Sequence, residues 1–172
     1  YEVGFMLAPR VNAAGRMASP DLATRLLLAV DESQIGEANK LAQRLDAENT
    51  RRREEEANIL KQARLAITAD PEIGAQNLLV VWGEGWHRGV IGIVASKLVD
   101  QFCRPVVVLS VDGDMAHGSG RSIPGFNLLA ALERCHDLFG RFGGHQQAAG
   151  MTMDADRLPE LRQRLAGLAN EQ

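Results

Sequence analysis

The stretch NLLVVWGEGWHRGVIGIVASKLVDQFCRPVVVLSV, residues 77–111, decides the fold class of this chain. Residues 77–82 and 105–111 are short apolar runs, which indicate strands of a sheet. Residues 90–101, between them, have the length and the apolar pattern of a helix. Strands that alternate with a helix in this way predict an α/β domain.

The alternation continues toward the end of the chain. We expect a Gly-rich strand at 116–122, a helix at 127–137, a strand at 148–153 and a closing helix at 156–169. Together with the first stretch, these segments predict a mixed β-sheet flanked by helices.

A long connector helix is expected before the sheet. Residues 37–69 contain no Gly and no Pro, and Ala, Leu, Glu, Gln and Arg dominate, all strong helix formers. About 33 residues at 1.5 Å each span about 50 Å, which is more than one small domain needs. Both ends are amphipathic, whereas residues 46–56 are polar all round, as in helices that cross solvent between two bodies. A shorter buried helix is expected at 21–30.

The composition excludes some classes of protein. The chain has 172 residues, of which 45% are hydrophobic, as in ordinary globular proteins. No apolar stretch approaches the roughly 20 residues of a membrane span, and the first residues lack the pattern of a secretory signal. We therefore expect a cytoplasmic protein without membrane contact. The net charge of −3 leaves room for a local basic site but argues against coating of nucleic acid by bulk attraction.

The two cysteines and the first residue carry two further expectations. Cys103 and Cys135 belong to no Cys-x-x-Cys pair and to no zinc-binding pattern. We expect both to be small buried side chains. The chain begins at Tyr1 without a Met and enters directly into an apolar segment, which indicates a piece of a longer protein.

Two Gly-rich segments could bind an anion through a strand end or a helix start. In GSGRSIPG, residues 118–125, Arg121 offers a fork of donors, Ser119 and Ser122 offer hydroxyls, and Gly120 lets a phosphate approach the backbone. A plain Gly-rich hairpin is the alternative. In WHRGVIG, residues 86–92, His87 and Arg88 would add donors to the positive end of a helix. The alternative there is a helix entrance with Gly chosen for packing.

Two more segments combine small residues with His or Arg. In FGGHQQAAG, residues 142–150, Gly143 and Gly144 would let backbone N–H groups form an anion-binding concavity with His145 at its edge. A structural His is the alternative. In PRVNAAGR, residues 9–16, Arg10 and Arg16 lie in what we interpret as a small-residue loop, and structural Arg residues between two domains would look the same.

A metal centre is not predicted. Hydrolysis of phosphodiesters by metal ions needs clustered Asp and His ligands. Asp112 and Asp114 flank Gly113, and His117 follows, but this is a common composition for a hairpin turn.

The four segments together resemble the RecJ exonucleases of the DHH phosphoesterase superfamily. PRVNAAGRM, WHRGVIGIVASKL, GSGRSIPGFNLLAAL and FGGHQQAAG occur in that order over nearly the whole chain. The resemblance implies that residues 1–31 are the tail of a catalytic DHH domain, 32–70 a connector helix, and 71–172 a DHH-associated domain that binds substrate. It also implies 5′-to-3′ hydrolysis of single-stranded DNA in DNA repair and recombination by a metal-activated water.

The resemblance further implies roles for the candidate residues. Ser119, Arg121 and Ser122, with Gly120, would hold phosphates near the 5′ end of the strand. Gly143 and Gly144 would reach the scissile phosphate, with His145 as the catalytic residue. Arg10 and Arg16 would face the same cleft, and His87 and Arg88 are weaker candidates.

The resemblance implies Mn²⁺ or Mg²⁺ in the intact enzyme, but this chain has no DHH triplet. We therefore expect no metal on this chain and no activity from it alone. Single-stranded DNA is the implied partner, and single-strand-binding protein is a further candidate. The alternatives are another DHH-family phosphodiesterase acting on short oligonucleotides or cyclic dinucleotides, and a non-catalytic nucleic-acid-binding module.

Overall fold

The computed structural model describes residues 1–171, which divide into two compact units, residues 1–55 and the residues from Glu56 onward. The first unit is helical. It contains the π-helix η1 (Glu2–Leu7), α1 (Ala8–Met17), α2 (Asp21–Leu28), the short 3-10 helix η2 (Glu32–Gln34) and the first part of α3 (Ile35–Ala69). Its core is a small cluster of buried side chains: Ala14, Leu22, Ala23, Leu41 and Leu45.

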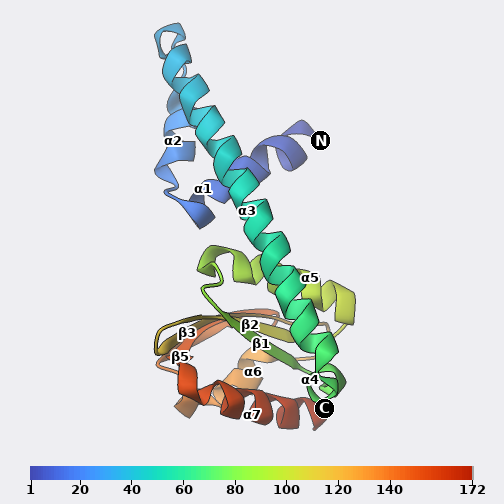
Figure 1. Cartoon of the computed structure of the whole chain (residues 1–172). Coiled ribbons are helices and arrows are strands. Elements are labelled where there is room, and N and C mark those ends of the chain that lie inside the picture. The colour runs from blue at the N-terminus through green and yellow to red at the C-terminus, as the bar shows by residue number, and fades with distance from the viewer. Residues whose placement is uncertain (172) are drawn as a thin grey trace. The chain divides into compact units, whose positions relative to one another are not determined.

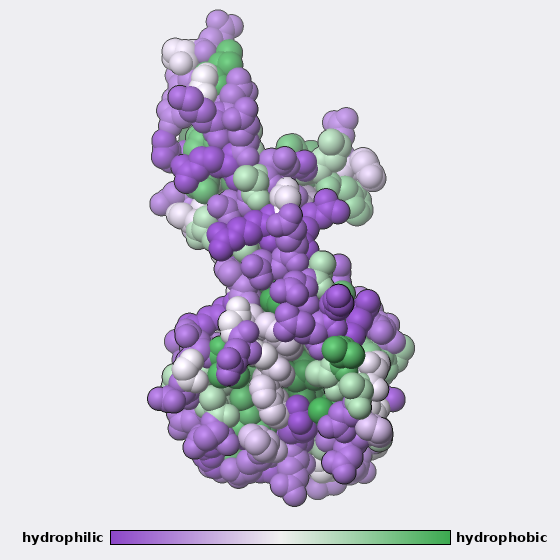
Figure 2. All heavy atoms as spheres, viewed as in Figure 1, coloured by the Kyte–Doolittle hydropathy of each residue, from purple (hydrophilic) through white to green (hydrophobic). Residues whose placement is uncertain are grey.

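Many large apolar side chains of this first unit are exposed. Green side chains are visible on its surface in Figure 2. The large hydrophobic residues that are exposed here are Tyr1, Val3, Phe5, Met6, Leu7, Leu27, Leu28, Val30 and Ile35. A monomer rarely leaves so much apolar surface in water unless another surface covers it.

The expected loop at residues 9–16 is wrong, because these residues form α1. Pro9 lies in the first turn of α1, where the missing N–H of proline costs no helical hydrogen bond. Ala13 and Ala14 are fully buried, so packing favours the helix in a segment that looked like a connection.

The long helix is confirmed as α3. Its residues up to Glu55 belong to the first unit, and its residues from Glu56 belong to the second. In the second part, Ile59, Ala63 and Ile67 recur every four residues and are buried, so they form one apolar stripe. Asp70 ends the helix and caps the short helix α4 (Pro71–Ala75), because its carboxylate accepts hydrogen bonds from the N–H groups of Glu72 and Ile73.

The second unit contains the expected mixed sheet. Its strands are β1 (Leu79–Glu84), β2 (Val106–Asp112), β3 (Met115–Arg121), β4 (Arg141–His145) and β5 (Ala148–Asp154), in the order β1-β2-β3-β5-β4. β1 and β2 are parallel and are joined through α5 (Arg88–Phe102), whereas the other neighbours are antiparallel. The α/β class predicted from residues 77–111 is therefore confirmed.

Helices cover the two faces of this sheet unequally. In Figure 1, α5 lies on one face, and α6 (Leu128–Glu133) and α7 (Leu158–Asn170) lie on the other. The α6–α7 face holds the main core, whose fully buried members include Leu109, Leu128, Leu132, Leu161 and Leu165. On the other face, α5 packs mainly against β2 and β3, so the helices of the described second unit cover the β5–β4 side of that face less.

Two segments differ from the sequence prediction. The helix expected at 127–137 divides into α6 and the 3-10 helix η3 (His136–Leu138). Residues 141–145, to which the sequence assigned no helix or strand, form β4, because a two-residue turn at 146–147 folds them back onto β5. Tertiary pairing supplies the hydrogen bonds that a Gly-rich sequence does not predict. η4 (Ala155–Arg157) leads into α7.

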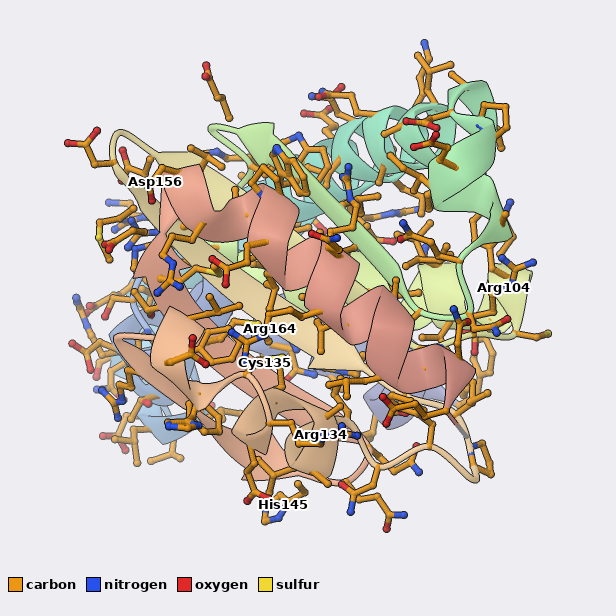
Figure 3. All side chains as sticks on the ribbon, turned by 90° about the horizontal axis from the view of Figure 1, so that it is seen from below. Arg104, Arg134, Cys135, His145, Asp156 and Arg164 are labelled. Atoms are coloured by element: carbon orange, nitrogen blue, oxygen red, sulfur yellow. The ribbon has the colours of Figure 1, made fainter. Side chains whose placement is uncertain are left out.

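The two cysteines occupy different environments. Cys103 is exposed, contrary to expectation, and ends α5 with a left-handed backbone, φ +53°. Cys135 is buried as expected and lies beside α7 near Arg164 (Figure 3). Burial raises the pKa of the Cys135 thiol, with Arg164 opposing this effect, so the thiol stays protonated near neutral pH.

Within residues 1–171, no helix combines the length and apolar character that crossing a membrane requires.

Candidate functional site

The neighbouring strands β3, β5 and β4 of the second unit each point alternate side chains to the two faces of the sheet. Residues paired directly across neighbouring strands have their side chains on the same face. On the face that α5 borders, the pairing forms three rows: His117–Thr152–Arg141, Ser119–Gly150–Gly143 and Arg121–Ala148–His145. We call the nine residues of these rows the open face.

Contacts of α5 and of β3 confirm which side chains share this face. A Cβ placed on Gly92 of α5 would lie 3.0 Å from the Ser119 Oγ and 3.1 Å from the Arg121 Nη2. The Arg121 Nη1 donates to the Ser119 Oγ at 3.0 Å and to the Gly120 carbonyl at 2.8 Å. The Arg121 guanidinium is therefore held against β3 at the border of the open face.

Arg121 and His145, at the two ends of one row, meet the condition that a shared site requires. Both residues pair with Ala148, one from each side, so their side chains lie on one face with a single strand between them. At about 4.8 Å between neighbouring strands, their Cα atoms are about 10 Å apart. A ligand that lies over Ala148 can reach both.

The glycines of these strands fall into two groups. On the core face, a Cβ on Gly118 would lie 2.7 Å from the Met151 Cγ, and a Cβ on Gly120 would lie 2.7 Å from the Leu128 Cδ2. On the open face, a Cβ on Gly143 would meet nothing within 4 Å, and one on Gly150 would meet only a carbonyl oxygen at 3.9 Å. Neither Gly143 nor Gly150 has a positive φ, so neither packing nor backbone conformation explains the missing side chain.

Gly144 has a third reason to be glycine. Its φ is +150°, and a Cβ there would lie 2.3 Å from the Ala148 carbonyl oxygen. The three glycines that were expected to contact phosphate thus divide. Gly143 lies on the open face, Gly120 lies on the opposite face against the core, and Gly144 allows the hairpin to form.

A shallow pocket lies over the small residues of the open face. Its volume is about 400 Å³, and Arg141, Gly143, Gly150 and Thr152 contribute to its lining. Phe142 and Met151, which alternate with these residues along the strands, complete the lining. The floor is therefore backbone that a ligand can approach closely.

The open face is basic and carries no acidic side chain. Burial lowers the pKa of His117 below its usual value, Arg88 lowers it further, and Asp112 opposes them. His117 is therefore neutral at pH 7, and its Nδ1 lies 3.4 Å from the Thr152 Oγ1. The positive charge of this face comes from Arg121 and Arg141.

The other sequence candidates of the second unit have structural contacts. The His87 Nδ1 accepts a hydrogen bond from the Gly89 N–H at 3.1 Å and so caps α5. Arg88 forms an ion pair with Asp112 at 2.9 Å. Asp112 pairs with Met115 at the start of β3. Six residues of strand, about 20 Å, separate Met115 from Arg121.

Ser122 also has a structural contact. Its hydroxyl donates to the Phe126 carbonyl at 2.8 Å. The hydrogen bonds of His87 and Ser122 and the ion pair of Arg88 are thus made within the fold.

Arg10 and Arg16 belong to the first unit. The Arg10 Nε donates to the Asp46 Oδ1 at 2.8 Å, and its Nη1 donates to the Met6 carbonyl at 2.6 Å. Arg16 borders a separate pocket of about 450 Å³. Six residues apart on α1, the two side chains point about 120° apart around the helix axis, so they do not share a face of α1.

Sequence reasoning missed Arg141, Gly150 and Thr152 as members of one surface. The alternation of residue types along these two strands could have indicated this surface. In the segments 141–145 and 148–154, every second residue is polar, small or basic, and the residues between them include Phe142, Met151 and Met153. Alternation with a period of two indicates a strand with one buried face. In β4 the pattern is weak, because two of its five residues are glycines.

No group of three or more His, Cys, Asp or Glu side chains suited to a metal ion occurs in the part of the chain that the structure describes. Asp112, Asp114 and His117 lie at the turn of the β2–β3 hairpin and just after it, as expected. The residues described therefore do not fit a divalent-ion site.

A family model for the DHHA1 domain matches residues 75–171. The chain belongs to the DHHA1 family. The DHHA1 match includes all five strands and therefore the whole open face.

The curated relatives that this chain matches are much longer than the chain. The single-stranded-DNA-specific exonuclease RecJ of Bacillus subtilis is 46% identical over 171 residues, which are 98% of this chain and 21% of that protein. RecJ of Escherichia coli is 39% identical, over 99% of this chain and 30% of that protein. The chain thus spans less than a third of these curated relatives.

Solved structures agree with these sequence matches. A crystal structure of RecJ from Thermus thermophilus in complex with Mg²⁺ has a TM-score of 0.85 and 36% identity, over 99% of this chain and 26% of that one. A crystal structure of exonuclease RecJ bound to manganese has a TM-score of 0.86, over 41% of that chain. The resemblance to RecJ exonucleases predicted from four sequence motifs is confirmed.

Proposed function

We propose that this chain is the substrate-binding part of a 5′-to-3′ single-stranded-DNA exonuclease, and that the open face holds the sugar-phosphate backbone of the DNA. The observation that carries the proposal is the pair Gly143 and Gly150. Their missing side chains leave a bare floor that neither packing nor backbone conformation requires. A floor of this kind lets a phosphate and its sugar approach the backbone.

The residues around this floor have the chemistry that the proposal needs. Arg121 presents a planar fork suited to phosphate oxygens, and the Ser119 hydroxyl lies 3.0 Å from it. His145, exposed at the end of β4, can donate a hydrogen bond from its imidazole to a phosphate that Arg121 also contacts. We propose that these groups position the reacting phosphate and neutralise charge that develops during hydrolysis.

The division of the intact protein is part of the proposal. We propose that residues 1–31 are the tail of the catalytic domain, residues 32–70 the connector and residues 71–172 the substrate-binding domain. The exposed apolar side chains of the first unit support this division, because they fit a segment that packs against a further domain.

The cofactor and setting of the intact enzyme are also proposals. We propose that the intact enzyme uses Mn²⁺ or Mg²⁺, which RecJ relatives bind. No step through a metal is assigned to the described residues, because no group of them fits an ion. We further propose that the intact enzyme is cytoplasmic and acts in DNA repair and recombination. Single-strand-binding protein is proposed as a further partner.

Arg121 provides the test of binding. Arg121→Ala should weaken binding of fluorescently labelled oligothymidylate about tenfold or more, because a hydrogen bond to a charged group contributes about 1.5–3 kcal/mol. The slope of log K against log salt should also become shallower by about 0.7 for each phosphate that the variant no longer neutralises. Fluorescence anisotropy at several salt concentrations measures both quantities.

Arg134→Ala is the matched control, since Arg134 is exposed and pairs with Glu171 at 2.6 Å, away from the open face. Thermal melting of both variants checks that they fold. Equal affinity of the two variants for DNA would contradict the proposal.

Catalysis needs a separate experiment. We expect this chain to bind single-stranded DNA with Mn²⁺ present without releasing nucleotides, while an intact homologue in the same assay releases them. Nucleotide release by this chain at a rate near that of the homologue would overturn the proposed division between binding and catalysis.

A further inference from the structure

The open face has a second polar row that the sequence motifs did not assign to any function. His117, Thr152 and Arg141 lie in one row across β3, β5 and β4. The row of Ser119, Gly150 and Gly143 separates it from the row of Arg121 and His145. Rows two residues apart are about 7 Å apart, so the two polar rows lie about 13 Å from each other. A trough floored by glycine therefore runs between two rows that can bind an anion.

Arg141 is the cation of this second row. Its side chain is exposed and, among residues 1–171, has no hydrogen-bond or ion-pair partner, in contrast to the ion-paired Arg88, Arg134 and Arg164. It lines the pocket over the glycine floor together with Thr152. An arginine at the edge of a bare floor is suited to a ligand phosphate, because its fork of donors is not used within the fold.

Thr152 completes the position. Thr152 lines the same pocket as Arg141, and its Oγ1 is 3.4 Å from the His117 Nδ1. A hydroxyl beside a guanidinium repeats the combination of Ser119 and Arg121 in the first polar row.

We propose that Arg141 and Thr152 form a second phosphate-binding position, so that a DNA strand crosses the trough with one phosphate at Arg121 and His145 and a later one at Arg141. This inference rests on the proposed function. It deepens that function by naming the substrate class. A strand must carry phosphates on both sides of the trough to gain from both rows, so the site favours oligonucleotides over dinucleotides.

The test compares two arginines and two lengths of DNA. Arg141→Ala should weaken binding of an oligothymidylate of about twelve nucleotides roughly tenfold and reduce its salt slope by about 0.7. The same variant should change the affinity for a thymidine dinucleotide, measured by competition, by less than about twofold, because a dinucleotide occupies the first row alone. Arg121→Ala should weaken both ligands.

Three controls make the result specific. Arg141→Lys should restore part of the salt slope but not the full affinity, because lysine keeps the charge without the fork. Thr152→Val, which is similar in shape, should weaken the longer ligand by a smaller factor. Arg134→Ala should match the unmodified chain.

The outcomes separate the inference from the proposed function. If Arg141→Ala binds both ligands like Arg134→Ala while Arg121→Ala binds them weakly, the second position does not exist but the proposed function stands. If Arg141→Ala weakens the dinucleotide as much as the longer strand, the two rows are not separate positions and the inference is wrong. If Arg121→Ala also binds like the control, the proposed function fails.

Discussion

The two faces of strands β3, β5 and β4 are built from the same short segments, yet they have opposite properties. The core face presents Gly118, Gly120 and Met151 to the tightly packed cluster under α6 and α7. The open face presents Arg121, Arg141, His145 and the bare floor of Gly143 and Gly150. The reason for a glycine therefore differs between the two faces. On the core face it makes room for a neighbour, and on the open face it leaves room for something that the chain itself does not supply.

The comparison predicts that stability depends on the core face and not on exposed positions. Leu132→Ala should lower the free energy of unfolding by about 2–5 kcal/mol, because Leu132 is fully buried and its removal leaves a cavity. Chemical denaturation measures the loss. The control Leu65→Ala, at a side chain 65% exposed, should change stability by less than about 0.5 kcal/mol. Similar losses of unfolding free energy in the two variants would contradict the assignment of Leu132 to the core.

The same substitution should have opposite effects on the two faces. Gly118→Ala should destabilise by about 1–3 kcal/mol, because the new methyl group would crowd both Met151 and Leu109. Gly143→Ala should stabilise slightly, by about 0.5 kcal/mol, because alanine restricts the unfolded chain and meets nothing in the folded one. Urea denaturation gives both values. Loss of DNA binding in a stable Gly143→Ala variant would sharpen the contrast, whereas unfolding of that variant would break it.

A smaller effect is expected from His117 on the open face. Its folded pKa lies below the usual value of 6.5, so the unfolded chain takes up this proton first as the pH falls. Stability should therefore decrease as the pH drops through about 6.5, and the loss should level off below the folded pKa. Urea midpoints at several pH values follow the change. His117→Gln should flatten this part of the profile, and an unchanged profile would exclude the effect.

The smallest effect is expected from Asp137, on the side of α6 and α7. A hydrogen bond from Arg164 is the main cause that lowers the pKa of this carboxyl from 3.8 to about 2, although it is exposed. The stabilising contribution of the charged form is present above about pH 4 and is lost as the pH falls toward 2. Asp137→Asn should make the acid limb of the thermal midpoint slightly shallower. A steeper limb would contradict this assignment.

Sequence reasoning succeeded where the signal is local. The apolar runs of β1 and β2 and the helical composition of α3 predicted these elements from neighbouring residues. It failed at α1 and β4. In both, packing or strand pairing with distant residues determined the conformation, of a small-residue segment at α1 and of a Gly-rich segment at β4.

The sequence by itself determined the class of the fold, the family and the presence of small-residue segments with Arg, His and Ser. Only the tertiary structure decided which of these residues share a surface. It joined Arg121, His145 and Arg141 on one face, turned Gly120 toward the core and tied Arg88 to Asp112. The physical reason is that the side of a sheet to which a residue points, and its neighbours there, follow from the register between strands. That register depends on pairing between segments far apart in the chain.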